Sequence, residues 1–168
     1  MPTKNPSPHN IVIKCFRNKR LEDVPTLYQA VEFFLDELLK RCTIAYKLNV
    51  LVTLRNGVLI DRDDGSQNVG LVEETEIKGE TWYKIDLSND LSFLELLSTL
   101  AHECVHLVQF ATGRLKSGDS WQWDGVDYGD AYEGDDVVDK DLPWEYDAYS
   151  KESELCKKFI KFYFSNPQ

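Results

Sequence analysis

Hydrophobic residues at the start of the chain fall into two patterns. Residues 11–16, Ile-Val-Ile-Lys-Cys-Phe, form a short β-branched run that predicts a strand. Residues 25–42 predict an amphipathic helix, because apolar side chains recur every three or four positions and Pro25 suits a first helical turn. The apolar positions of this helix are Leu27, Val31, Phe34, Leu35, Leu38 and Leu39. A strand followed by a helix is therefore expected to open the fold.

Two short apolar runs then flank a strong turn signal. Residues 50–54 and 58–60 lie on either side of Arg55, Asn56 and Gly57. The pair Asn-Gly is typical of the tight turn that joins two antiparallel strands. We therefore expect a β-hairpin here.

Two further strands are expected after a polar connection. Residues 71–78 and 81–87 are separated by a Gly-Glu pair and are rich in residues that favour strands. In the second run Tyr83, Ile85 and Leu87 alternate with polar or bulky residues, so they point to one side. The sheet is expected to have one buried face and to be rich in antiparallel pairs.

A long helix is expected from about Ser92 to Thr112. Ser92 and Glu95 have the spacing of a capping box, and Gly113 is a suitable end for the helix. One face of this helix is apolar and carries Leu97, Leu100, Cys104, Val108 and Ala111. Another side carries Glu95, Thr99, His102, His106 and Gln109. The two histidines therefore lie on a face that the core does not need.

The remaining chain predicts a loop and a final helix. Residues 114–142 are acidic and aromatic without a sustained period, so we expect a long loop with room for a short hairpin. A helix is expected from Pro143, with an apolar face made of Ala148, Leu155, Cys156, Phe159, Ile160 and Tyr163. The length fits one α+β domain over residues 1–168, and the Pro-rich residues 1–10 are expected to be flexible.

The charge of the chain disfavours two classes of partner. The sequence has 29 acidic and 19 basic side chains and a formal net charge of -10. Such a charge repels phosphate backbones and anionic membrane surfaces, so we expect neither nucleic acid nor a membrane as partner. Acidic residues are dense between Asp119 and Asp141, where Lys140 is the one basic residue. The pattern of a calcium-binding loop is not met there, which disfavours a calcium site.

Cysteine spacing and the start of the chain bear on its compartment. The four cysteines, at positions 15, 42, 104 and 156, form no C-x-x-C pair, so we expect free thiols rather than a zinc ribbon or a redox site. The first twenty residues lack the apolar stretch of a signal peptide, and no run is long enough to span a membrane. A reducing, cytoplasmic setting is expected.

The motif that carries chemistry is His-Glu-Cys-Val-His at residues 102–106, which matches H-E-x-x-H inside an independently predicted helix. Residues four apart lie one turn above each other, so His102 and His106 can reach one zinc ion at the usual distance of roughly 2.0 to 2.1 Å. Glu103 is rotated by about 100° from His102, beside the position of a bound water. It can accept the proton of that water, so the motif predicts zinc-dependent hydrolysis with Glu103 as base.

A catalytic zinc usually takes a third protein ligand. The metzincin pattern would put that ligand at Thr112 and a glycine at the position of Gln109, so this class is excluded. His9 is the one other histidine, and its place in the expected flexible start disfavours it. The third ligand is therefore expected to be a carboxylate.

Acidic residues on the last helix are the best candidates, because a ligand on a flexible loop costs entropy on binding. The candidates are Glu145, Asp147, Glu152 and Glu154. Glu145 is favoured, since it lies in the first turn and shares a helix face with the small Ala148. Glu152 and Asp147 remain alternatives.

Three segments resemble a known group of proteins. AHECVHLVQFATG, WDGVDY and LPWEYDAY are similar to small H-E-x-x-H zinc peptidase-like proteins of phages and bacteria. The resemblance covers roughly the second half of the chain. A wider resemblance is to gluzincins, in which the third ligand opens an E-x-x-A-D segment on a later helix.

This resemblance implies several site roles. Glu145 would be the third ligand, with Ala148 at the matching position, whereas Tyr149 stands where the pattern has Asp. The residue that orients a zinc-binding histidine is therefore open between Asp147, Glu152 and a backbone carbonyl. The implied fold is a minimal zincin-like domain, in which a substrate peptide pairs with the sheet edge. The oxyanion donor is open between three tyrosines, Tyr149, Tyr132 and Tyr128.

The leading hypothesis is a zinc metalloendopeptidase that acts on a peptide or protein substrate. The alternative is a zincin-fold, zinc-binding structural or partner-binding protein, of phage origin, without efficient proteolysis. The small size leaves little room for a deep cleft, and the acidic loop could cover the site or bind a basic partner. Iron, cobalt and manganese also suit two imidazoles and a carboxylate, and zinc is the default metal.

Overall fold

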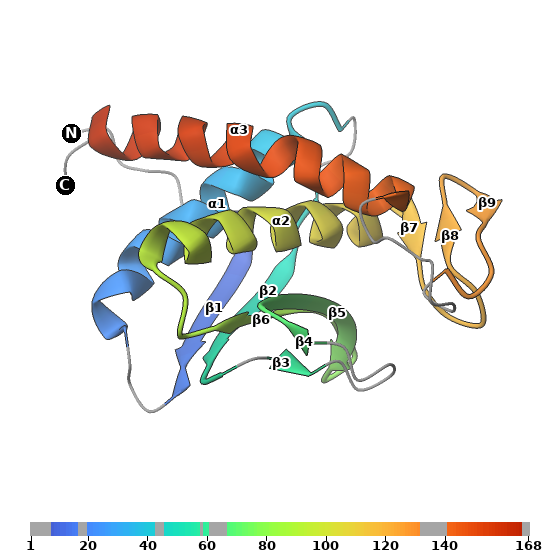
Figure 1. The fold of residues 1–168 in the computed structure, drawn as a ribbon, viewed down its shortest axis with the longest axis horizontal. Helices are drawn as coiled ribbons and strands as arrows, with labels where there is room; N and C mark the ends of the chain where they lie inside the picture. The colour runs from blue at the N-terminus through green and yellow to red at the C-terminus, as the bar shows by residue number, and fades with distance from the viewer. Residues whose placement is uncertain are drawn as a thin grey trace.

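A four-stranded sheet forms the base of the fold in the computed structural model, which describes residues 8–16, 20–42, 46–57, 59–60, 67–131 and 141–165. The strand order is β1-β2-β6-β5, so β1 and β5 are its edges (Figure 1). These strands are β1 (Asn10–Cys15), β2 (Asn49–Arg55), β5 (Gly70–Ile77) and β6 (Glu80–Ser88).

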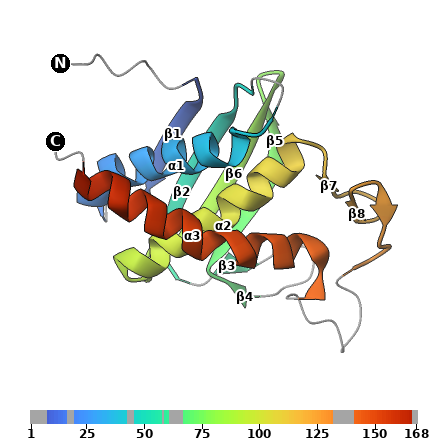
Figure 2. The same cartoon turned by 90° about the horizontal axis from the view of Figure 1, so that it is seen from above.

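Three helices lie on one side of this sheet. The helices α1 (Val24–Leu39) and α2 (Phe93–Ala111) cover its face, and a 3-10 turn, η2 (Leu21–Asp23), precedes α1. Helix α3 (Pro143–Ser165) lies over α1 and α2 on the side away from the sheet, as Figures 1 and 2 both show. The α+β class predicted from the sequence is confirmed.

The hairpin predicted at Asn56 and Gly57 is wrong. Strand β2 pairs in parallel with β1 on one edge and with β6 on the other, so neither edge is open to the residues that follow it. The chain instead leaves the sheet, where the Gly57 N–H donates to Asp90 Oδ2 at 2.9 Å. Strand β3 (Leu59–Ile60) pairs with β4 (Gln67–Asn68) in a separate ladder. Within the four-stranded sheet only β5 and β6 are antiparallel, so this sheet is less antiparallel than expected.

The tight hairpin of the sheet joins β5 to β6. Lys78 and Gly79 both have positive φ, at 54° and 78°, as a two-residue hairpin turn requires. The predicted alternation in β6 is confirmed, because Tyr83, Ile85 and Leu87 are buried beneath the helices.

Helix α2 begins and ends as its sequence predicts. The Ser92 hydroxyl accepts from the Glu95 N–H at 3.3 Å, and the Glu95 carboxylate accepts from the Ser92 N–H at 2.8 Å. This capping box satisfies N–H groups that a helix start leaves without partners. After the helix, Gly113 adopts a φ of 72°, which favours glycine. The H-E-x-x-H motif at residues 102–106 thus lies in the middle of a well-defined helix.

Part of the expected loop between α2 and α3 forms a small sheet. Its strands are β7 (Leu115–Lys116), β8 (Gln122–Trp123) and β9 (Val126–Asp127). Beside it Trp121 stacks on the buried Trp144, with ring centroids 5.5 Å apart and planes 16° apart. The contact joins this sheet to the first turn of α3. Residues 132–140 lie outside the described residues.

The start of the fold lies earlier than expected. His9 is buried, and its Nδ1 accepts a hydrogen bond from the Leu48 N–H at 3.3 Å. Asn10 already belongs to β1, so the flexible start expected over residues 1–10 does not extend to residues 8–10. Residues 1–7 lie outside the described part. The four cysteines are free, as predicted.

Candidate metal centre

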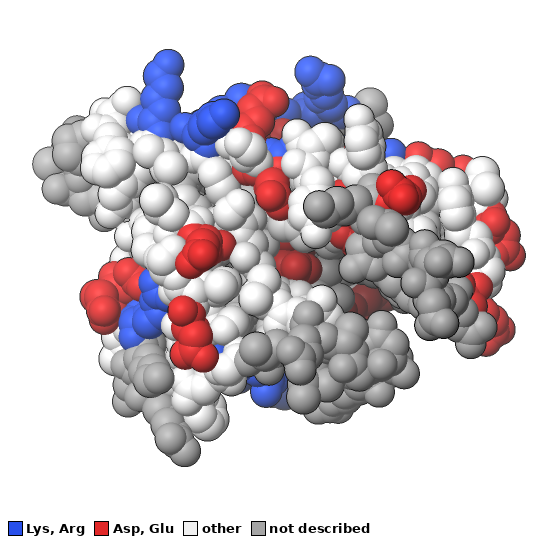
Figure 3. Space-filling view, in the orientation of Figure 1, with Lys and Arg blue, Asp and Glu red and all other residues white. Residues whose placement is uncertain are grey.

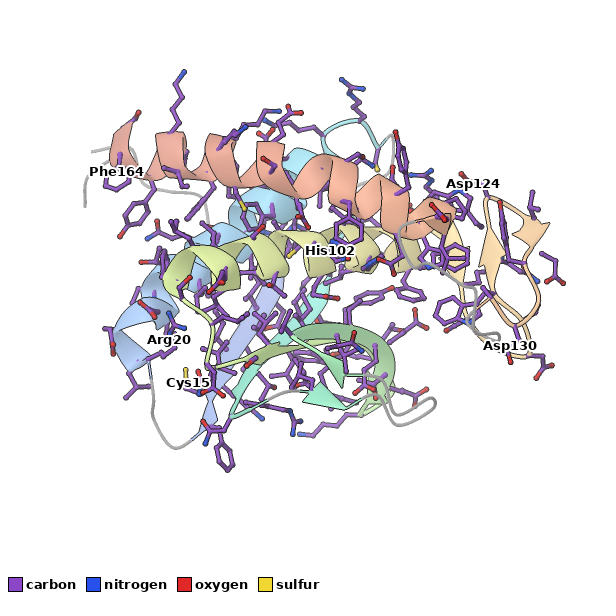
Figure 4. All side chains as sticks on the ribbon, viewed as in Figure 1. Cys15, Arg20, His102, Asp124, Asp130 and Phe164 are labelled. Atoms are coloured by element: carbon purple, nitrogen blue, oxygen red, sulfur yellow. The ribbon has the colours of Figure 1, made fainter. Side chains whose placement is uncertain are left out.

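Two histidines of α2 and one carboxylate of α3 converge on a single point. His102 and His106 lie one helical turn apart and face α3, with their Nε2 atoms 3.0 Å apart. Figure 4 shows His102 between α2 and α3. The two side chains expose only 13% and 9% of their surface. Their donor atoms therefore lie in a largely dry site.

Glu145 completes this group from the first turn of α3. Its Oε2 lies 3.2 Å from the Nε2 of each histidine, and the three ligand atoms fall within 4.8 Å of one another. A tetrahedral zinc with bonds near 2.0 to 2.1 Å separates its ligands by roughly 3.3 Å, so the group fits such an ion closely. These three side chains could hold a metal ion, as the sequence predicted.

The outer nitrogen of each histidine has its own acceptor. His102 Nδ1 lies 2.9 Å from Glu152 Oε2, and His106 Nδ1 lies 2.8 Å from Gln109 Oε1. A carboxylate and an amide oxygen only accept hydrogen bonds, so both Nδ1 atoms carry the hydrogen. In the metal-free protein a proton on Nε2 donates to Glu145, and loss of that proton would leave the Nε2 lone pair free to bind a metal ion.

The shifted pKa values of His106 and Glu145 indicate that a positive charge is favourable at the centre of the group. Burial opposes a charge on His106, but the hydrogen bond and the negative charge of Glu145 outweigh it and raise the pKa of His106 to about 9. Burial likewise opposes a charge on Glu145, but hydrogen bonds to both histidines lower its pKa to about 2. Without a metal, protons supply the positive charge, and a divalent cation would replace them.

Glu103 lies beside this group but turns toward the edge strand β5. It is 6% exposed, and burial raises the pKa of its carboxyl group. A Cβ atom added at Gly70 of β5 would lie 2.6 Å from Glu103 Oε1 and 2.5 Å from Thr99 Cγ2. Glycine at position 70 therefore lets the edge strand approach the carboxylate.

The other acids considered for the third ligand have different contacts. Glu152 binds the Nδ1 of His102 and so orients it, one of the roles that the sequence left open. Asp147 accepts from the Gln109 side chain at 2.9 Å and from Lys151 Nζ at 2.7 Å. Neither belongs to the group that could hold a metal.

The three candidate tyrosines and His9 differ in their distance from the site. The ring of Tyr149 lies 4.6 Å from that of His102, whereas Tyr128 packs edge to face on Trp144. Tyr132 lies outside the described residues. His9 is held between Leu48 and Asp36 and takes no part in the centre. Among the described tyrosines, Tyr149 contacts a histidine of the site.

Three residues of the site were not assigned from the sequence. Gln109 was placed on the histidine face of the helix by its spacing, yet nothing in the spacing gave it a partner. Gly70 and Trp144 are distant in sequence from the motif, and only the packing of β5 and α3 against α2 brings them to it.

Most of the described surface on the face drawn in Figure 3 is uncharged. Acidic side chains are scattered over this face, and lysine and arginine lie along its upper edge and at a few places lower down. An acidic surface raises the local concentration of cations. The formal net charge of -10 has the same sign and so favours cations over anions near the protein.

Comparison of the chain with protein-family models, curated proteins and solved structures finds no match. Within the described residues, no helix combines the length and the apolar character needed to cross a membrane.

Proposed function

We propose that this protein is a zinc-dependent metallopeptidase of the gluzincin type. The proposal rests on the convergence of His102, His106 and Glu145 on one point, with Glu103 as the next residue after the first histidine. Two imidazoles and one glutamate leave a zinc ion room for water, which is the ligand set of a catalytic rather than a structural site. The order of strand, helix, sheet, metal helix and later ligand helix also supports a zincin-like fold.

The side chains of the site have separate roles in this proposal. His102, His106 and Glu145 would hold the zinc ion, which would lower the pKa of a water toward 7 and polarise the peptide carbonyl. Glu103 takes the proton of the attacking water and passes it to the departing amine, a role suited to a carboxyl whose pKa burial raises. Tyr149, beside His102, donates to the developing oxyanion.

The substrate in this proposal is an extended peptide that adds to the edge of the sheet at β5. This strand pairs with β6 on one side, and its other side carries no ladder among the described residues. An edge strand presents backbone groups to a peptide. Gly70 of β5 lies against Glu103, so a peptide on this edge would pass close to the base.

One observation favours the alternative function. Glu103 is nearly covered, and Gly70 and Thr99 lie close to its carboxylate, which restricts the approach of water and substrate. A zinc-binding protein that binds a partner without efficient proteolysis would not need an accessible Glu103 carboxylate. Both functions predict a bound zinc ion, so only a measurement of peptide cleavage distinguishes the peptidase from the binding protein.

The deciding experiment compares the wild type with Glu103→Gln. Zinc content is measured by inductively coupled plasma mass spectrometry, and cleavage of a diverse peptide library is read by mass spectrometry. We expect one zinc per chain in both proteins and cleavage by the wild type alone. A wild type that holds zinc and cuts no peptide would establish the binding function instead. If the mass spectrometry finds iron, cobalt or manganese in place of zinc, the proposed metal is wrong.

A further inference from the structure

The geometry points to Gln109 as the residue that holds the two halves of the metal centre together. It fixes the ring of His106 on α2 and binds the backbone of α3 directly before Glu145. Gln109 is thus a positioning residue rather than a ligand. The inference rests on the metal site of the proposed function and not on peptide cleavage.

The side chain of Gln109 makes three hydrogen bonds in a buried position. It is 2% exposed. Its Oε1 lies 2.8 Å from His106 Nδ1, and its Nε2 donates to the Trp144 carbonyl at 3.0 Å and to Asp147 Oδ2 at 2.9 Å. Both hydrogens of the amide and its oxygen therefore have partners.

These partners fix the orientation of the amide. The Trp144 carbonyl and the Asp147 carboxylate are both acceptors, so the NH₂ group must face them. A flipped amide would set its oxygen against two acceptor oxygens. The oxygen of Gln109 therefore faces His106, whose Nδ1 must donate. The lone pair of His106 Nε2 is left for the metal, and no charge is needed to set this tautomer.

The same amide connects segments that are far apart in the sequence. The bond from Gln109 to Trp144 spans 35 residues and reaches the residue before Glu145. Asp147, the second anchor, is held in turn by Lys151 Nζ at 2.7 and 2.8 Å. The orientation of one ligand and the backbone position of another thus depend on a single side chain.

A carboxylate could not replace the amide. Glutamate at position 109 would still accept from His106, but it would set an oxygen against the Trp144 carbonyl and the Asp147 carboxylate. Buried like charges and unpaired acceptors are both costly. The position beside His102 differs from the position beside His106. The Nδ1 partner of His102 is the carboxylate of Glu152, and among the described residues Glu152 has no acceptor to which it would have to donate a hydrogen bond.

The test uses Gln109→Leu and Gln109→Glu, with Gln29→Leu on α1 as the matched control. Zinc affinity is measured by competition with a chromophoric chelator, using zinc alone as the probe. Loss of a partner of a metal-binding histidine typically weakens metal binding about 10- to 100-fold. We expect that loss in Gln109→Leu, which removes the partner of His106, and also in Gln109→Glu, which sets a carboxylate against the Trp144 carbonyl and Asp147. Gln29→Leu should keep wild-type affinity. Circular dichroism of the metal-free proteins reports whether each variant folds.

A second measurement uses the wild type and stays informative if the variants fail to fold. Nitrogen-15 spectra of the histidine rings in the zinc-loaded protein should show His106 with a proton on Nδ1 and zinc on Nε2. In a folded Gln109→Leu the His106 Nδ1–H signal should shift or exchange faster, while that of His102 should not.

The inference is overturned if folded Gln109 variants bind zinc as the wild type does, or if wild-type His106 binds zinc through Nδ1. Absence of peptide cleavage would overturn the proposed peptidase and leave this inference intact. A wild type that binds no zinc would overturn both.

Discussion

At the scale of single residues, the candidate metal centre combines side chains that come together in two different ways. His102 and His106 are brought together by the period of one helix, so their spacing predicted the pair directly. Glu145 meets them only because α3 packs on α2, and several acids of α3 had a suitable helical position. The sequence therefore limited the third ligand to a short set, and the distances of 3.2 Å to both histidines distinguish Glu145 within it.

Replacement of Glu145 should weaken the metal site selectively. Glu145→Ala removes one of three ligands, and we expect zinc affinity to fall at least tenfold in the chelator competition. Glu154→Ala is the matched control, because this acid lies on the same helix with a side chain that is 70% exposed. Equal zinc affinity in the two variants would exclude Glu145 as a ligand.

A methyl group at position 70 should disturb Glu103 without removing a ligand. In Gly70→Ala the new Cβ would collide with Glu103 and Thr99, and overpacking of this kind costs about 1–3 kcal/mol of stability. We expect reduced peptide cleavage with unchanged zinc content, measured on the same preparations. Gly118→Ala is the control, because a Cβ atom added at position 118 has no neighbour within 4 Å. It should change neither peptide cleavage nor zinc content. Full activity in Gly70→Ala would show that the Glu103 carboxylate adapts freely.

At the scale of elements, local patterns predicted the helices better than the strand pairing. The capping box of α2 and Pro143 of α3 are local signals, and both helices begin where those signals lie. The Asn56-Gly57 pair is also a local signal, but the hairpin that it predicted is wrong. Strand β2 pairs with β1 and β6, and both strands lie far from this pair in the sequence. Parallel pairing of this kind leaves no mark in the turn residues.

The small β7–β9 sheet should support the centre through α3. Trp121 stacks on Trp144, which precedes Glu145, so Trp121→Ala should loosen the first turn of α3. We expect a loss of about 1 kcal/mol or more in urea unfolding, together with weaker zinc binding. Trp82→Ala on β6 should lower stability without affecting zinc. If the zinc affinity of Trp121→Ala equals that of Trp82→Ala, the stack does not support the site.

At the scale of the whole molecule, the stability of the metal-free protein should depend on pH in a defined direction. The pKa of His106 rises from 6.5 to about 9, so its contribution is present below about pH 6.5 and is lost as the pH rises toward 9. The pKa of Glu145 falls from 4.5 to about 2, so its contribution is present above pH 4.5 and is lost as the pH falls toward 2.

These two contributions should overlap between about pH 4.5 and 6.5. Urea unfolding in the presence of a chelator should therefore give a higher free energy of unfolding at pH 6 than at pH 9. The raised pKa of the buried Glu103 acts in the same direction, since its charge is costly at high pH. Greater stability of the metal-free protein at pH 9 would contradict this assignment. Added zinc should reverse the trend, because metal and protons compete for the same ligands.

The metal centre also joins two parts of the chain that are 39 residues apart, from His106 to Glu145. An ion bound by these side chains would close this loop as a removable cross-link, and such links stabilise a fold more when the loop is long. Loss of such an ion would remove one of the contacts that hold the first turn of α3 to α2, so this end of the helix would open to proteases more often. The lifetime of the protein in a cell should therefore follow the supply of metal, so that scarcity shortens its half-life before any substrate is involved.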